Sequence, residues 1–211
     1  MSAYWPDNAA SKYKHQKTGY KILGANPSRE EAFNLMGTQP WFIQGLANHE
    51  SGVRQFVANP GKPLWGFPDG WGIMQTDPPS QRDDVYKWTV NIPLGISRVN
   101  LKNEEVSSFW TRQVKQFSDW NRLHPKAQIA GPSDATEGKC TFSYSPTGSQ
   151  HSFLDAMWIK DYNGSPKPND PSLHSGFYIY WEDAANPPYW QINNTNNKGK
   201  DYVEFVCNAL P

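Results

Sequence analysis

Charged residues are scarce in this sequence, and the two signs cancel. Among 211 residues, 20 Lys and Arg stand against 20 Asp and Glu, so charged residues make up 19% and the formal net charge is zero. A neutral chain has no electrostatic attraction for nucleic acid or for an acidic membrane surface. No apolar run approaches the roughly 18 residues that a membrane-spanning helix needs. We therefore expect no nucleic-acid partner and no membrane span.

Cysteine is rarer still, with Cys140 and Cys207 alone. These two residues would form one disulfide in an oxidising compartment, and two buried free thiols are an equal alternative. Together with five scattered histidines, they show none of the spacings of a zinc site. The sequence thus predicts neither a metal nor a cofactor.

The N-terminal residues lack the basic stretch and apolar run of a cleavable secretory signal. We expect a chain that reaches its target without a cleaved signal, or a domain excised from a longer protein. Residues 1–27 are predicted to form an irregular arm with solvated lysines. Residues 28–211 are long enough for a single domain with its own hydrophobic core.

Aromatic residues are abundant: 10 Trp, 10 Tyr and 10 Phe make up 14% of the chain. Combined with many Asn, Gly, Ser and Pro residues, they suit a neutral polar polymer whose sugar rings stack on aromatic faces. The alternative is that most of these rings form the core, because aromatic burial dominates core energetics.

Apolar periodicity and capping signals predict an α+β fold that is mainly helical. Ser28 and Glu31 have the spacing of a capping box, which opens a helix that Gly37 ends. Thr38 is expected to cap a second helix that runs to Glu50. Further helices are expected at residues 91–99, 103–117, 153–162 and 202–207, two of them capped by Asn91 and Asn103.

Turn signals predict the rest of the fold. Asp69-Gly70 is a credible hairpin turn within a segment rich in Gly and Pro. Residues 124–149 are predicted to be turn-rich, and residues 165–200 to form a long loop. Loops of this length are usually functional or disordered, and the density of aromatic residues argues against disorder. The aromatic cluster in this loop comprises Phe177, Tyr178, Tyr180, Trp181, Tyr189 and Trp190.

Residues 50–75 give the strongest indication of chemistry. Glu50 is predicted at the C-terminal end of an apolar helix, ahead of a loop rich in Gly, Pro and Trp. Cleavage of a glycosidic bond needs a carboxyl group that stays protonated and gives its proton to the leaving oxygen. Apolar surroundings and the negative end of a helix both favour the protonated form. The alternative is an exposed helix-terminal Glu without a catalytic role.

Three short motifs carry a family resemblance. Glu50-Ser51-Gly52, Gly72-Ile73-Met74-Gln75 and Tyr162-Asn163-Gly164 follow the order and approximate spacing of the motifs of soluble-type lytic transglycosylases. Residues 201–206 resemble the closing helix of that family. The chain resembles members of the lysozyme-like superfamily, which includes goose-type lysozymes, over roughly residues 38–100 and 150–207. The third motif departs from the usual Ala-Tyr-Asn-Ala-Gly, since this chain has Asp-Tyr-Asn-Gly-Ser.

The resemblance implies a lysozyme-like fold with a small hairpin wall, and it implies roles by position. Glu50 would be the general acid and later the general base, and Ser51 would hold the acid or bind substrate. Tyr162 would hydrogen-bond the Glu50 carboxyl, and Asn163 would contact an N-acetyl group. Helix termination is the alternative for these last two residues, and core packing for Met74. In the cleft wall, Met74 would lie against a sugar and Gln75 would bond the polar edge of that sugar. The other wall residues would be Trp71, Gly72 and Ile73.

Two acidic residues decide between hydrolysis and transglycosylation. Transglycosylases need no second carboxylate, whereas an inverting hydrolase needs a base about 6.5–9.5 Å from the acid to admit water. Asp77 stands where goose-type lysozymes place an acidic residue after a similar run, and Asp69 is the other candidate. Either could instead be a turn residue. The presence of Asp77 inclines us to hydrolysis.

The resemblance therefore implies a muramidase that cleaves the β-1,4 bond between MurNAc and GlcNAc in peptidoglycan strands. The alternatives are a lytic transglycosylase, a chitinase or chitosanase, a non-catalytic glycan-binding module and a structural phage-tail domain. Without a signal, we expect delivery to the periplasm or cell wall as a phage enzyme or as a toxin exported by a secretion apparatus. A toxin would have an immunity protein as its partner, and the enzyme is expected to be a monomer.

Overall fold

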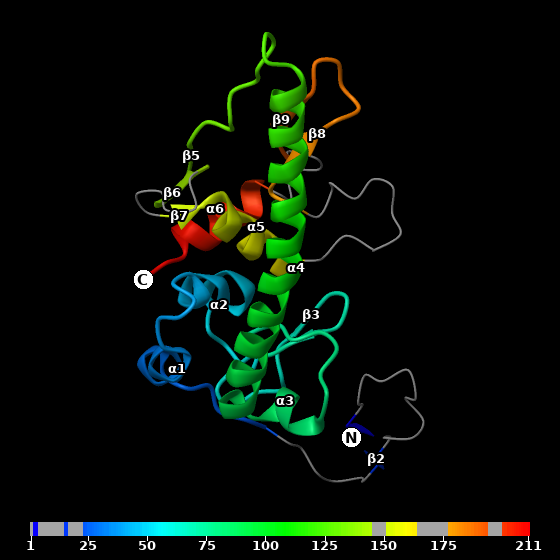
Figure 1. The fold of residues 1–211 in the computed structure, drawn as a ribbon. Coiled ribbons are helices and arrows are strands. Elements are labelled where there is room, and N and C mark those ends of the chain that lie inside the picture. Colours follow the sequence, from blue (N-terminus) through cyan, green and yellow to red (C-terminus); the bar gives the residue numbers. More distant parts are fainter. Residues whose placement is uncertain (1, 4–14, 17–22, 145–150, 164–176, 194–199) are drawn as a thin grey trace. The chain divides into compact units, whose positions relative to one another are not determined.

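The computed structural model describes residues 2–3, 15–16, 23–144, 151–163, 177–193 and 200–211. These residues form helices and small sheets, which is the α+β class that the sequence predicts (Figure 1). The chain divides into two compact units, residues 1–97 with Pro211 and residues 98–210, and each is described by itself. The predicted catalytic domain over residues 28–211 and its lysozyme-like fold stay predictions.

The first unit combines short helices with two small antiparallel pairs. The predicted irregular arm contains one of these pairs, β1 with β2. The core includes Phe42, Leu46, Phe56, Ile73 and Ile92, all nearly or completely buried. The elements are β1 (Ser2–Ala3), β2 (His15–Gln16), α1 (Arg29–Met36), α2 (Ile43–Ser51), β3 (Trp65–Gly66), β4 (Gly70–Trp71), α3 (Arg82–Tyr86) and the start of α4 (Trp88–Leu123).

Helix α1 confirms the predicted capping box. The Glu31 N–H donates to the Ser28 hydroxyl at 3.1 Å, and the Ser28 N–H donates to the Glu31 carboxylate at 2.7 Å. Both bonds satisfy donors that the first helical turn would leave without partners. Hydrogen bonds from the Ser28 hydroxyl and N–H lower the pKa of Glu31. Gly37 ends the helix as predicted.

Helix α2 ends where the sequence predicts but begins later. Its N-cap is Phe42, which makes no side-chain capping bond, so the expectation that Thr38 caps this helix is wrong. The Ile43 N–H donates to the Pro40 carbonyl at 2.9 Å, which closes a turn before the helix begins. The predicted C-terminal end is confirmed: Glu50 lies in the last turn, and Gly52 is the left-handed C-cap.

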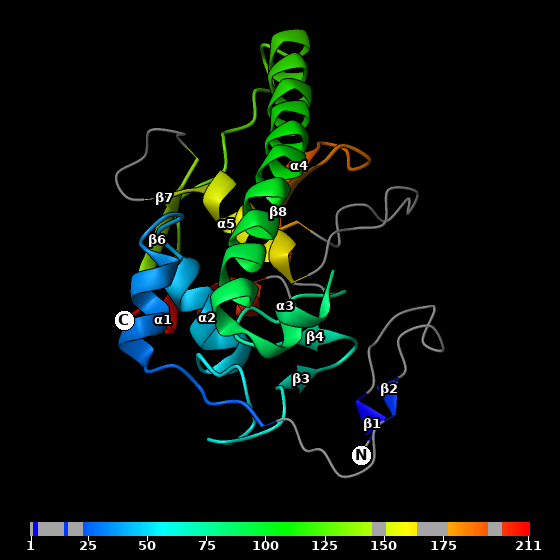
Figure 2. The same ribbon diagram turned by 90° about the horizontal axis from the view of Figure 1, so that it is seen from below.

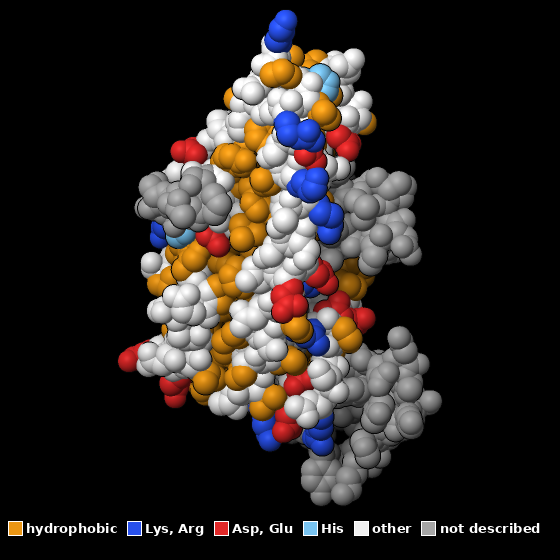
Figure 3. Space-filling view, viewed as in Figure 1, with side chains coloured by type: hydrophobic (Ala, Val, Ile, Leu, Met, Phe, Trp, Pro, Cys, Tyr) orange, Lys and Arg blue, Asp and Glu red, His pale blue; other side chains and the backbone are white. Residues whose placement is uncertain are grey.

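A single long helix replaces two predicted ones. Helix α4 is continuous from Trp88 to Leu123, so the separate helices expected to start at Asn91 and Asn103 are wrong. No Pro or Gly lies between Ile96 and Asn103 to break the helix, and Val99 and Val106 keep one buried face. Lys and Arg side chains follow the exposed side of the second half of this helix (Figure 3).

The second unit holds the remaining helices and strands around an aromatic core. In this core Phe109 stacks on Phe177 with ring centroids 3.6 Å apart, and Phe117 packs edge-on against Trp181 at 5.3 Å. Its elements are the rest of α4, β5 (Ala135–Glu137), β6 (Cys140–Ser143), β7 (His151–Ser152), α5 (Phe153–Tyr162), β8 (Ile179–Glu182), β9 (Tyr189–Ile192) and α6 (Lys200–Asn208).

Two segments predicted as loops contain strands. Within residues 124–149, β5 pairs antiparallel with β6. Just beyond this range, β7 joins β6 in parallel. Within residues 165–200, β8 and β9 form an antiparallel hairpin with Trp181 opposite Trp190. The hairpin is anchored because the Trp181 N–H donates to the buried Gln113 amide oxygen at 2.6 Å. Aromatic residues favour strands when they pack on a neighbouring surface, which the sequence alone does not show.

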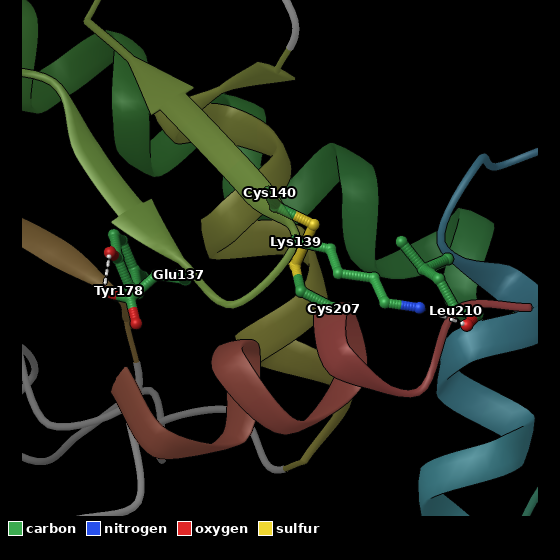
Figure 4. Close-up of a disulfide and its surroundings, with 6 residues drawn as sticks. All are labelled: Glu137, Lys139, Cys140, Tyr178, Cys207 and Leu210. Carbon is green, nitrogen blue, oxygen red and sulfur yellow. Dashed lines mark hydrogen bonds between the residues drawn. A yellow bond between two sulfur atoms is a disulfide. The ribbon is translucent and has the colours of Figure 1, made fainter.

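A disulfide joins Cys140 of β6 to Cys207 of α6, which settles the alternative left open above (Figure 4). The two Cα atoms lie 5.8 Å apart across 67 residues of sequence. Nearby, the buried Tyr178 hydroxyl donates to the Glu137 carboxylate at 2.8 Å. Burial and the charge of Glu137 raise the pKa of Tyr178 far above its usual range. This part of the second unit is therefore held covalently and by a buried polar pair.

We predict that replacing both cysteines, Cys140→Ser with Cys207→Ser, lowers the free energy of unfolding by about 2–4 kcal/mol. The physical reason is the large loop that the disulfide closes in the unfolded chain. Chemical denaturation of the oxidised protein and of the double variant measures the difference. Wild-type protein treated with a reductant should match the variant, and equal midpoints for all three samples would contradict the prediction.

Candidate active site

The carboxylate of Glu50 lies at the C-terminal end of α2 in the first unit. Its side chain is partly exposed, whereas the preceding helical residues Leu46 and Ala47 are completely buried. The helix stops because Gly52 adopts a left-handed conformation, and its N–H donates to the carbonyls of Ala47 and Asn48. The predicted place of Glu50, at the end of a largely buried helix, is thus present.

Ser51 connects this helix end to the segment of the second motif. Its side chain is 5% exposed, and its hydroxyl lies 2.8 Å from the Ile73 carbonyl oxygen and 3.1 Å from that of Ala47. A hydroxyl has one proton to donate at a time, and the shorter distance favours Ile73. The structure therefore brings the residue after Glu50 into direct contact with Gly72–Gln75.

The backbone of Gly72–Gln75 follows a turn that only particular residues permit. Gly72 has φ +72°, and a Cβ atom there would come within 2.4 Å of the Gln55 amide. Gln75 has φ +44°, and its amide donates to the Gly72 carbonyl at 2.8 Å. The Gln75 side-chain oxygen also lies close to Gly66 and Gly70, where Cβ atoms would meet it at 2.1 and 2.8 Å. The Gln75 side chain is thus fitted against the β3–β4 hairpin, whose two strands are labelled in Figure 2.

Two buried amides that sequence reasoning did not assign to the site hold this turn in place. Asn91 accepts from the Met74 N–H at 2.9 Å and donates to the carbonyls of Trp71 and Asp84, each at 2.9 Å. Gln55 accepts from the Ile73 N–H at 3.2 Å and donates to the Val85 carbonyl at 2.7 Å. Both side chains are 0% exposed. For Asn91 the available signal is a polar residue amid apolar helical periodicity, a pattern that equally predicts a helix cap. Gln55 lies outside helix and strand and carries no such signal.

The predicted wall residues divide into buried and accessible ones. Ile73 and Met74 are 0% exposed, and Met74 packs against Gly95 of α4 within the first unit. This burial favours the core interpretation of Met74, and contact of either residue with a sugar stays a prediction. Trp71 and Gln75 are partly exposed.

The two candidate bases lie on exposed parts of the first unit. Asp69 lies in the loop between β3 and β4, which confirms the hairpin turn predicted at Asp69-Gly70. Asp77 is also exposed and follows Thr76, whose backbone bridges to Trp71. Both acids are therefore accessible, and a catalytic role for either one stays a prediction.

Tyr162 and Asn163 lie in the second unit, so their predicted contact with Glu50 and its substrate stays untested. Helix α5 ends at Tyr162, and Asn163 is its C-cap, which confirms the predicted end of this helix. Gly164, the last residue of that motif, lies outside the described residues. Tyr162 is partly exposed, and the preceding Asp161 is buried with its carboxylate 3.9 Å from the Lys102 ammonium.

Within the described ranges, no group of three or more His, Cys, Asp or Glu side chains is placed to hold a metal ion. None of the helices in that part of the chain is long and apolar enough to cross a membrane. Comparison with protein-family models, with curated proteins and with solved structures finds no match.

We predict that Asn91→Ala lowers the free energy of unfolding by about 2–4 kcal/mol, because it leaves several buried backbone groups without partners. Thermal and urea denaturation followed by circular dichroism measure the loss. Asn100→Ala, at an exposed position of the same helix, is the matched control and should change stability little. Equal effects of the two substitutions would show that the buried amide does not stabilise the turn.

Proposed function

We propose that this protein is a glycosidase that cleaves peptidoglycan strands, with Glu50 as the general acid. The observation that carries the proposal is the contact between the Ser51 hydroxyl and the Ile73 carbonyl. It joins the end of the helix that bears Glu50 to the glycine-flanked turn of the second motif. These are the two segments whose order and spacing resemble those of lysozyme-like enzymes.

The position of Glu50 suits the chemistry of an acid. The α2 carbonyls at the helix C-terminus carry partial negative charge, which disfavours an ionised carboxylate beside them. The preceding helical residues Leu46 and Ala47 are completely buried, and Glu50 itself is partly exposed, which leaves it accessible to a substrate. A protonated carboxyl there could donate to the bridging oxygen as the bond breaks.

The proposed substrate is the β-1,4 bond between MurNAc and GlcNAc, which follows from the resemblance. Two features of the chain agree with an extracytoplasmic glycan whose sugar backbone is uncharged. The net charge is zero, and the Cys140–Cys207 disulfide is typical of proteins that work in an oxidising compartment such as the periplasm. Delivery there by a phage or by a secretion apparatus, with an immunity protein in the second case, belongs to the same proposal.

We predict that Glu50→Gln lowers the rate of release of soluble fragments from purified peptidoglycan by about 10²–10⁴-fold, as expected for loss of a general acid. The amide keeps the shape of the side chain but has no acidic proton to give. Glu30→Gln, an exposed position on α1, is the control and should retain wild-type activity. If Glu50→Gln folds and digests cell walls at the wild-type rate, the catalytic assignment is wrong.

A further prediction concerns the second acid. If water attacks with Asp77 as base, Asp77→Asn should lower activity about 10²-fold or more, and the wild-type products should have free reducing ends. Asp69→Asn, in the hairpin loop, should then remain active. Mass spectrometry of the digest measures the products. Anhydro products, one water lighter, together with full activity of both variants would establish transglycosylation instead.

A further inference from the structure

The β3–β4 hairpin leaves two large aromatic side chains in solvent. Trp65 on β3 is 50% exposed, and Phe67 in the connecting loop is 90% exposed. Most other aromatic side chains that the structure describes are buried or partly buried, including Trp181, Tyr178 and Phe56. Exposed aromatic residues clustered on one short hairpin are typical of a binding surface rather than of a core.

The hairpin presents these rings on a fixed framework. Trp65 pairs directly with Trp71 in the antiparallel register, and residues opposite each other project from the same face of a ribbon. The Gly72 N–H donates to the Leu64 carbonyl at 2.9 Å, and the Leu64 N–H donates to the Gln55 carbonyl at 2.8 Å. The side chain of Gln75, the last residue of the Gly72–Gln75 turn, lies against Gly66 and Gly70 of the hairpin. The hairpin is therefore ordered before a ligand binds, so binding loses little further conformational entropy of its backbone.

The chemistry of the hairpin favours a neutral ring as its ligand. Residues 64–71 read Leu-Trp-Gly-Phe-Pro-Asp-Gly-Trp, with one acid and no Lys or Arg. Such a surface does not attract phosphate groups or anionic lipids. The faces of aromatic rings carry negative charge density, which attracts the C–H groups on the flat face of a pyranose.

We propose that Trp65 and Phe67 form an aromatic platform on which sugar rings of the glycan strand stack. The inference rests on the proposed function, because the hairpin continues through Trp71 into the turn that contacts Ser51, next to Glu50. The platform binds N-acetylated sugars of the strand and takes no part in bond cleavage. It lengthens the stretch of glycan that the protein holds.

Binding is best measured in the full chain carrying Glu50→Gln, so that the strand stays intact. The probes are purified peptidoglycan sacculi in a sedimentation assay and the hexamer of N-acetylglucosamine in calorimetry. We expect Trp65→Ala with Phe67→Ala to weaken binding by about tenfold or more. Tyr189→Ala, an aromatic residue that is 46% exposed on the β8–β9 hairpin, is the matched control and should bind as the parent does.

Conservative variants separate sugar stacking from general apolar docking. Trp65→Tyr should restore most of the affinity, whereas Trp65→Leu should not, because only an aromatic ring offers a face to the sugar. Equal affinity of the Tyr and Leu variants would overturn the stacking proposal, as would unchanged sacculus binding in the double variant. Binding of neutral phosphatidylcholine vesicles that is lost in the double variant would assign the platform to lipid and overturn it too. If the wild-type protein does not cleave peptidoglycan but the double variant loses glycan binding, the platform is supported and the glycosidase proposal is refuted.

Discussion

The buried turn at Gly72–Gln75 is the constraint on which the first unit depends. Its residues lie outside helix and strand, yet Gly72, Ile73 and Met74 are buried, so their backbone groups need partners from side chains. Ser51, Gln55 and Asn91 provide these partners from three different parts of the chain. An unpaired buried group costs about 1–3 kcal/mol, so the three polar side chains are stabilising where apolar ones would not be. The path of the turn, and with it the position of the hairpin, follows from this requirement.

Local strain is concentrated around the same turn. Val53 and Gln75 have positive φ values of 60° and 44°, a region that side chains other than Gly rarely adopt. Residues in such conformations cost on the order of 1–3 kcal/mol and persist where the surroundings hold them. Val53 follows Gly52, the C-cap of α2, and Gln75 closes the turn with its bond to Gly72. The two segments that carry Glu50 and the second motif therefore contain strained backbone that lowers the stability of the fold, a feature typical of functional sites.

The sequence predicted what depends on neighbouring residues and missed what depends on distant ones. The Ser28–Glu31 capping box, the end of α2 after Glu50 and the hairpin turn at Asp69-Gly70 are local patterns, and all are present. The β8–β9 hairpin depends on Gln113 and Phe117, far away in sequence, so its own residues predict only a loop. The local pattern around Asn91 predicts a helix cap, because its four partners lie 7 to 20 residues away. Of the candidate site, the sequence identified the segments that meet at Ser51 but not the amides that hold them.

Some residues of the motifs are needed for folding alone, and others are not. Tyr202, Val203, Val206 and Cys207 are buried at helical spacing in α6, as any amphipathic helix anchored by a disulfide would require. Ser51 and Gly72 are likewise needed for the backbone contacts of the turn, and Ile73 and Met74 for the core. Substitutions at these positions would reduce stability and activity together, so they cannot separate the two. Glu50, Asp69 and Asp77 are partly or fully exposed, so substitutions there change charge without removing a buried apolar side chain. The proposed chemistry is therefore best tested at these accessible carboxylates, provided that the stability of each variant is measured together with its activity.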